Sequence, residues 1–134
     1  MARKSKEPVW IETRDVLAIH DRLLAVHGGA VGLRDQGLLE SGLGRPRQHH
    51  AYADSPDIAE MAALYTAGVV RNHPFVDGNK RTGFVIGILF LELNGFSFKA
   101  SEVEATQAVM SLAAGALDEA GYCAWLRESV SLKR

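Results

Sequence analysis

Cysteine and long apolar runs are scarce in this 134-residue chain, and each scarcity excludes a class of protein. The single cysteine, Cys123, cannot form an internal disulfide, and it excludes a cysteine-rich zinc site. The longest apolar run, Phe84 to Leu91, is far shorter than the ~20 residues that a membrane-spanning helix needs. No apolar stretch follows the charged N-terminus, so a signal peptide is not expected. These features predict a soluble, cytoplasmic protein.

An excess of charge of one sign is also lacking. The 15 Lys and Arg residues are balanced by 16 Asp and Glu residues, which gives a formal net charge of -1. Such a balance provides no broad basic surface for DNA, RNA or an anionic membrane. We therefore expect no direct binding to a nucleic acid or to a membrane. A phosphate ligand would have to be bound by a local cluster of polar groups.

The remaining composition is that of a folded globular protein. Hydrophobic residues make up 47% of the chain and charged residues 23%, and the length favours one domain over residues 1–134. Residues 1–10 are expected to be a flexible N-terminus. Strand-like alternation is weak and helical spacing is strong, so the sequence predicts an all-α bundle of about six helices.

Caps and stop signals place these helices along the chain. The predicted helices cover about residues 14–27, 35–43, 56–72, 79–94, 102–115 and 118–130. Pro46 is expected to end the second helix, which leaves residues 45–54 as a surface loop or a short hairpin. Pro74 is expected to hold His73 in an extended conformation and so to end the third helix near Asn72. The helix over 79–94 is apolar on every side at its middle, which predicts a central buried helix.

Residues with useful chemistry are concentrated at residues 71–82, between the third and fourth helices. The start of a helix has unpaired N–H groups and the positive end of the helix dipole, which together bind anions. Gly78 leaves this backbone open to a phosphate, while Lys80 and Arg81 add positive charge. Arg81 can also hold phosphate oxygens in bidentate fashion.

Two further side chains in this segment suit phosphate chemistry. Asp77 can hold the magnesium ion that accompanies a nucleoside triphosphate. His73 has an ordinary pKa of ~6.5, which suits proton abstraction near neutral pH. Phe75 lies between them and is expected to anchor the loop in the core. Each residue alone has an ordinary explanation as a cap, a turn residue or a solvated charge, but their concentration at one helix start favours a phosphate site.

The same segment resembles a family signature. Residues 73–81, His-Pro-Phe-Val-Asp-Gly-Asn-Lys-Arg, match the pattern H-x-F-x-[DE]-[AG]-N-[GK]-R of the Fic/Doc family at every constrained position. The flanking segments Gly32-Leu-Arg-Asp35 and Gly37-Leu-Leu-Glu-Ser41 resemble the death-on-curing (Doc) branch of that family. The likeness extends over about residues 16–95.

The resemblance implies an all-helical fold that transfers part of ATP to a hydroxyl group of a target protein. His73 would be the general base, and Asp77 would be the ligand of Mg²⁺. The implied phosphate-binding residues open the fourth helix: Gly78, Asn79, Lys80 and Arg81. The predicted loop over residues 45–54 would correspond to the flap of the family, which positions the target segment beside the active site.

Two positions bear on which part of ATP is transferred. Members that transfer AMP resemble a pattern with a second glycine where this chain has Lys80, and with a further arginine where it has Phe84. A lysine at this place adds a charge that can stabilise a transferring γ-phosphoryl group. The resemblance therefore implies a Doc-like protein kinase that phosphorylates a threonine of elongation factor Tu and stops translation. AMP transfer to a protein hydroxyl is the alternative.

The Doc branch also implies a partner. Its members are toxins of type II toxin–antitoxin pairs, each inhibited by a separate antitoxin whose C-terminal segment docks on the toxin. Two other classes of function stay open on the sequence alone. One is a metal-dependent phosphohydrolase or nuclease with His73 and Asp77 as ligands, and the other is a non-catalytic binding module with a Fic-like fold.

Overall fold

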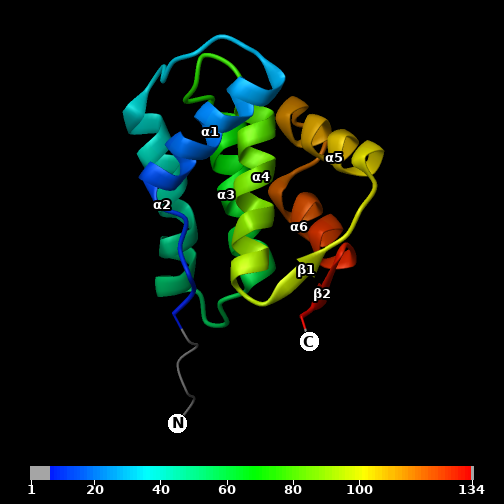
Figure 1. The fold of residues 1–134 in the computed structure, drawn as a ribbon. Coiled ribbons are helices and arrows are strands. Elements are labelled where there is room, and N and C mark those ends of the chain that lie inside the picture. Colours follow the sequence, from blue (N-terminus) through cyan, green and yellow to red (C-terminus); the bar gives the residue numbers. More distant parts are fainter. Residues whose placement is uncertain (1–6, 134) are drawn as a thin grey trace.

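The computed structural model describes residues 7–133, which form six helices and one small sheet (Figure 1). The helices are α1 (Thr13–His27), α2 (Gln36–Tyr52), α3 (Ile58–Asn72), α4 (Asn79–Leu93), α5 (Glu102–Ala114) and α6 (Glu119–Glu128). The antiparallel strands β1 (Phe96–Phe98) and β2 (Val130–Leu132) pair with Phe96 opposite Leu132. The predicted six-helix bundle is confirmed, whereas the sequence did not predict the two short strands.

Helix α3 lies at the centre of the bundle, with α2 on one side and α5 and α6 on the other (Figure 1). Ten of its 15 residues are buried, against seven of 15 in α4. Helix α4, the helix expected to be central, runs along α3 and keeps a partly open side. Phe84 and Val85 on that side are half-buried and line a pocket. The apolar surface of α4 therefore serves the core and a pocket together.

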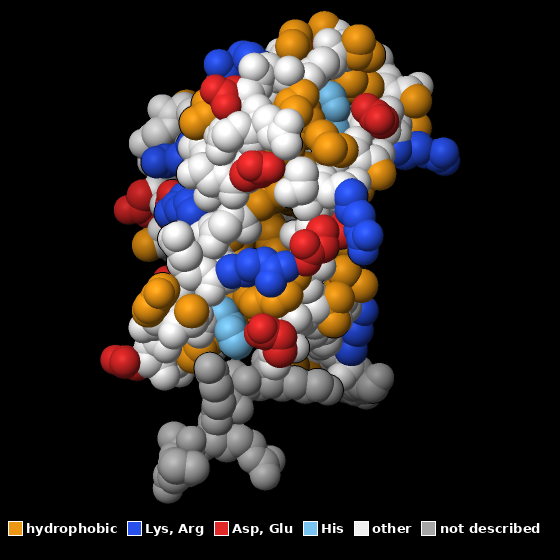
Figure 2. Space-filling model, turned by 90° about the vertical axis from the view of Figure 1, so that its left-hand side faces the viewer, with side chains coloured by type: hydrophobic (Ala, Val, Ile, Leu, Met, Phe, Trp, Pro, Cys, Tyr) orange, Lys and Arg blue, Asp and Glu red, His pale blue; other side chains and the backbone are white. Residues whose placement is uncertain are grey.

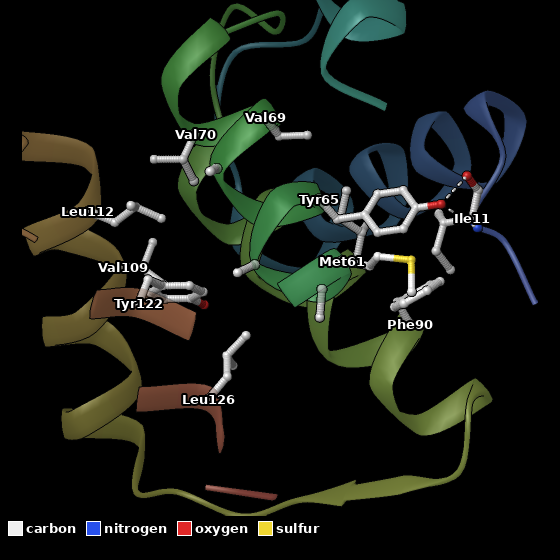
Figure 3. Packing of buried hydrophobic residues seen from close by; sticks show 14 of the residues in the cluster. Ile11, Met61, Tyr65, Val69, Val70, Phe90, Val109, Leu112, Tyr122 and Leu126 are labelled. Atoms are coloured by element: carbon white, nitrogen blue, oxygen red, sulfur yellow. Dashed lines mark hydrogen bonds between the residues drawn. The ribbon is translucent and has the colours of Figure 1, made fainter. Parts of the chain in front are cut away.

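The core contains one buried hydroxyl that ties the N-terminal segment to α3 (Figure 3). The Tyr65 hydroxyl accepts a hydrogen bond from the Ile11 N–H (3.0 Å) and donates one to the Ile11 carbonyl (3.2 Å). Burial raises the pKa of Tyr65 to about 12, so this hydroxyl stays protonated at neutral pH. Its ring packs on Phe90 of α4, which joins the two central helices and the segment before α1.

The described part of the N-terminus is held against the bundle. Val9 exchanges two hydrogen bonds with the side chain of Asn94, of 2.8 and 3.0 Å, and the Trp10 ring stacks on Phe90 at 6.0 Å. The flexible N-terminus predicted over residues 1–10 therefore does not extend to Val9 and Trp10. Its first part, residues 1–6, lies outside the described residues.

Helix α2 continues to Tyr52, so the prediction of a surface loop over residues 45–54 is wrong for most of that segment. A proline inside a helix removes one backbone hydrogen bond, and for this reason Pro46 resembles a stop signal in the sequence. Tertiary contacts offset that loss. Pro46 is buried, and the neighbouring Arg45 makes a bidentate ion pair with Glu119 of α6 at 2.7 and 2.9 Å.

The position of this segment also contradicts its prediction as a flap beside the active site. The Asn72 side chain donates a hydrogen bond to the Leu38 carbonyl (2.9 Å), which places the start of α2 beside the end of α3. At the other end, His49 accepts a hydrogen bond from the Asp57 N–H (3.3 Å) just before α3 begins. Residues 49–54 therefore lie beside the start of α3, at the end of the bundle remote from His73.

Charges of both signs are mixed on the surface. Figure 2 shows basic and acidic side chains mixed over one face of the molecule, with several hydrophobic side chains gathered at the top of the view. Within residues 7–133, no helix is both long and apolar enough to cross a membrane.

Helices α2 and α3 approach so closely that their backbones touch at Gly42 and Gly68. A Cβ atom at Gly42 would lie 2.9 Å from the carbonyl oxygen of Gly68, a backbone atom that cannot turn aside. We expect Gly42→Ala to lower the free energy of unfolding by about 1–3 kcal/mol, because it overpacks this contact.

Gly44→Ala in the same helix is the matched control, because a Cβ there would meet nothing within 4 Å. It should raise the free energy of unfolding by about 0.5–1 kcal/mol, since alanine is favoured over glycine inside a helix. Urea unfolding of both variants measures the contrast. Equal stabilities would contradict the backbone contact.

Candidate functional site

Two loops lie side by side at one end of the bundle (Figure 1). We call residues 73–78, between α3 and α4, the site loop, and residues 28–35, between α1 and α2, the α1–α2 loop. Leu33 and Phe75 form an antiparallel bridge between the loops, and further backbone hydrogen bonds extend it on both sides. The segment beside the predicted site is thus the α1–α2 loop, not residues 45–54.

His73 begins the site loop as the C-cap of α3. Its backbone is left-handed, with φ 53° and ψ 53°, so the helix ends after Asn72 as predicted, but the predicted extended conformation of His73 is wrong. This conformation turns the chain sharply out of α3, and for a residue other than glycine it costs about 1–3 kcal/mol. The His73 side chain is exposed and lines the pocket described below.

Phe75 anchors the site loop, as the sequence predicted. Its side chain is 1% exposed, and its ring stacks on the buried imidazole of His20 from α1, with centroids 3.7 Å apart. The Asn79 side chain accepts a hydrogen bond from the Phe75 N–H and donates one to the Phe75 carbonyl, both at 2.9 Å. The Asn79 side chain is therefore committed to the loop, and only its backbone N–H is left for a phosphate.

The start of α4 leaves backbone donors unpaired. The first N–H bonded within the helix belongs to Thr82 and donates to the Gly78 carbonyl (3.0 Å). Among the described residues, no acceptor is found for the N–H groups of Asn79, Lys80 and Arg81, as is usual for the first turn of a helix. Gly78 takes a φ of 80°, the left-handed region that favours glycine, so its backbone conformation is what requires glycine here.

An open pocket of about 740 Å³ lies over this helix start, a volume typical of small-molecule sites. The site residues predicted from the sequence all line it: His73, Asp77, Gly78, Asn79, Lys80 and Arg81. The facing wall comes from β1 and α5 and includes Phe98, Val109 and Met110, and the exposed side of α4 adds Phe84 and Val85. The site loop and the start of α4 therefore form a polar, cationic end of the pocket. The other end is mostly apolar and also includes Ser101, Glu102 and Thr106.

Hydrogen bonds hold the Asp77 carboxylate at the polar end. One oxygen accepts from the N–H of Ala30 (3.2 Å) and the other from the N–H of Gly78 (2.8 Å). The hydrogen bond from Ala30 has the largest effect on the pKa of Asp77 and lowers it, and the one from Gly78 lowers it as well. The nearby imidazoles of His20 and His73 lower this pKa further. The carboxylate is therefore ionised at neutral pH, with lone pairs left for a cation.

Two neighbours leave room for this carboxylate and fix its backbone. A Cβ at Gly29, whose φ is 127°, would lie 2.9 Å from one Asp77 carboxylate oxygen, so a larger residue would displace it. The Nε2 atom of His20 lies 2.8 Å from the Asp77 carbonyl, in hydrogen-bond contact. The α1–α2 loop and α1 therefore both contact Asp77.

The protein ligands at this site fit a magnesium ion only if a phosphate group of a bound molecule also coordinates it. Within residues 7–133, no three His, Cys, Asp or Glu side chains gather where they could hold a metal together. Mg²⁺ is commonly bound by one or two carboxylates, with substrate phosphates and water completing its octahedron. Asp77 alone fits that arrangement.

Several residues that shape the site carry no local signal of that role in the sequence. They are His20, Gly29 and Arg34. Their contacts join segments that are 39 to 57 residues apart. No local pattern reports contacts of that kind.

Comparisons with known proteins agree with the signature in the site loop. Residues 10–91 match the model of the Fic/DOC family. The chain is 36% identical over 85 residues to "Protein kinase doc" of Escherichia phage P1, which covers 63% of this chain and 68% of that protein. It is also 35% identical over 92 residues to "Toxin Doc" of Mycolicibacterium smegmatis, which covers 68% of each.

The Asp77 hydrogen bonds predict a pH-dependent part of the stability. The folded-state pKa lies below the ordinary 3.8, so the contribution is complete above that pH and is lost as the pH falls through the folded value. We expect Asp77→Asn to be less stable than the wild type at neutral pH, with the difference shrinking below pH 3.8. Urea unfolding at several pH values measures this difference.

Asp21→Asn is the control, because Asp21 is exposed on α1 and makes no hydrogen bond among the described residues. It should keep the wild-type free energy of unfolding at neutral pH. A gap between Asp77→Asn and the wild type that grows in acid would refute the assignment.

Proposed function

The chain belongs to the Fic/Doc family, and on that premise we propose that it is a Doc-type toxin kinase that transfers the γ-phosphate of ATP to a serine or threonine hydroxyl of a protein. The names of its two relatives, a protein kinase and a toxin, support this assignment. The observation that carries the proposal is a single pocket. It joins the exposed imidazole of His73 to the unpaired amides that open α4.

The polar end of the pocket suits the phosphates of ATP. The free N–H groups of residues 79–81 and the positive end of the α4 dipole attract anions, and both Lys80 and Arg81 are exposed beside them. Donors fixed in place before the reaction stabilise charge that develops on the transferring phosphoryl group. The apolar wall of β1 and α5 leaves space for the nucleoside at the other end.

His73 and Asp77 would have the two remaining roles, proton acceptance and binding of Mg²⁺. In the transfer, the acceptor hydroxyl oxygen forms a bond to the γ-phosphorus while the bond from that phosphorus to the bridging oxygen breaks, and ADP leaves. His73 takes the hydroxyl proton, because its exposed side chain borders the same pocket as the phosphate site. Asp77 would hold Mg²⁺, which supplies neutralisation of phosphate charge when bound.

The residues at the start of α4 favour γ-phosphate transfer over AMP transfer. Lys80 lines the pocket where the AMP-transferring pattern has glycine, so its side chain takes space and adds charge near the phosphates. Phe84 lines it where that pattern has arginine, so a second guanidinium is missing from this face of α4. Both features support the kinase, with AMP transfer as the alternative that the labelling experiment below separates.

The proposal includes partners. We take elongation factor Tu as the target, in the cytoplasm, with arrest of translation as the outcome. The likeness to a protein named "Toxin Doc" supports a separate antitoxin whose C-terminal segment docks on this chain. A toxin that arrests translation in its own cell would require such an inhibitor.

The central test uses ATP labelled at the γ or the α position, with magnesium and a bacterial translation extract. We expect label on a protein from the γ position alone, and no label with His73→Ala, because the base is lost. Stability should change little in that variant, since His73 is exposed. Protein label from α-labelled ATP would mean AMP transfer, and wild-type transfer by His73→Ala would remove His73 from the mechanism.

Arg81→Ala should weaken ATP binding about tenfold or more, because a charge-assisted hydrogen bond to phosphate is lost. Isothermal titration with ATP and magnesium measures the affinity. Arg14→Ala is the control, because Arg14 is exposed on α1 and does not line the pocket. Equal affinities for the two variants would show that Arg81 does not bind the nucleotide.

A further inference from the structure

The backbone of His73 is held in a conformation that its own sequence opposes. It is the one non-glycine residue with a positive φ within residues 7–133. A side chain disfavours the left-handed region, and the following Pro74 favours an extended backbone at this position. Strain of this kind persists only where the surroundings impose it, and it gathers at functional sites. Contacts from another segment must therefore hold His73.

Arg34 of the α1–α2 loop supplies those contacts. Its Nε donates a hydrogen bond to the His73 carbonyl (2.8 Å), and its Nη2 donates one to the Asn72 carbonyl (3.1 Å). Its backbone N–H donates to the Pro74 carbonyl at 2.6 Å. One residue thus binds three consecutive carbonyl groups around the point where α3 ends.

Charge and position both suit this role. The carbonyls at the end of a helix lack intrahelical partners and carry the negative end of its dipole, so a cation that spans them is favourable. A planar guanidinium can reach two acceptors at once, whereas a lysine ammonium acts as a point charge. The bridge between Leu33 and Phe75 keeps Arg34 in place beside the site loop.

We propose that Arg34 is a positioning residue, which fixes the left-handed backbone of His73 and thereby directs its imidazole into the pocket. The inference rests on the proposed function, since it assigns Arg34 a part in the reaction of that site. Arg34 does not line the pocket, so it acts on the acceptor and on ATP only through His73.

The other parts of the site are held by hydrogen bonds that do not involve the Arg34 side chain. Loss of that side chain should therefore affect His73 alone. Asp77 is held by the N–H groups of Ala30 and Gly78 and contacts His20, and none of these contacts involves the Arg34 side chain. The amides that open α4 likewise keep their place through the hydrogen bonds between Asn79 and Phe75. Loss of the guanidinium should therefore affect proton transfer and spare nucleotide binding.

The experiment compares Arg34→Ala, Arg34→Lys and the control Arg14→Ala with the wild type. For Arg34→Ala we expect a single-turnover transfer rate about tenfold to a hundredfold lower, with an unchanged Kd for ATP, because misplacement of a reacting group costs rate. Arg34→Lys should fall between Arg34→Ala and the wild type. Free guanidinium, well below denaturing concentrations, should restore part of the rate of Arg34→Ala, since the site of the lost side chain is exposed.

The inference would be overturned by a wild-type rate for Arg34→Ala, by a rate loss matched by weaker ATP binding, or by a rate loss explained by unfolding in a melting curve. His73→Ala, assayed in parallel, separates the two proposals. An inactive His73→Ala with a fully active Arg34→Ala removes only the role of Arg34, whereas an active His73→Ala removes the proposed mechanism. Backbone chemical shifts of His73 in Arg34→Ala provide a readout without substrate, and they should move away from left-handed values; unchanged shifts would also overturn the inference.

Discussion

The two hydrogen bonds between the Asn79 side chain and the backbone of Phe75 close the loop on which the whole site depends. They are buried, so an unmade bond would leave polar groups without water. They satisfy both backbone groups of Phe75 with a side chain, and the first amides of α4 stay unpaired beside the closed loop. The stack of Phe75 on His20 then fixes the closed loop to α1. A single amide side chain thus shapes the loop beside the proposed phosphate site.

Local signals in the sequence were sufficient for most helix ends. Ser101 and Asp118 cap α5 and α6 through hydrogen bonds to amides three residues on, and Gly115 ends α5 in the left-handed region. Helix α2 was missed beyond Pro46, because the contacts that hold its second half come from α6 and the N-terminal segment. The short strands were missed for a similar reason, since β1 and β2 pair across more than thirty residues. Helix and strand propensities depend on neighbouring residues in the sequence, so they do not report these long-range contacts.

The candidate site shows the same division. The signature in the site loop was sufficient to select six residues that the fold brings to one pocket. It could not show that the Asn79 side chain is used internally, or that His73 takes a left-handed backbone against the preference of Pro74. Both features follow from hydrogen bonds that form only when the α1–α2 loop and the start of α4 meet the site loop. The sequence signature identifies the polar residues of the site, whereas tertiary contacts determine how these residues are oriented.

The two ends of the pocket come from different parts of the chain. The polar end lies within residues 10–91, which match the Fic/DOC family, whereas Phe98, Val109 and Met110 of the apolar wall lie after that region. Under the proposed function, changes in that wall would alter which nucleotides fit without disturbing the site loop. A C-terminal segment that differs from that of another family member could therefore give the same proposed reaction a different nucleotide preference.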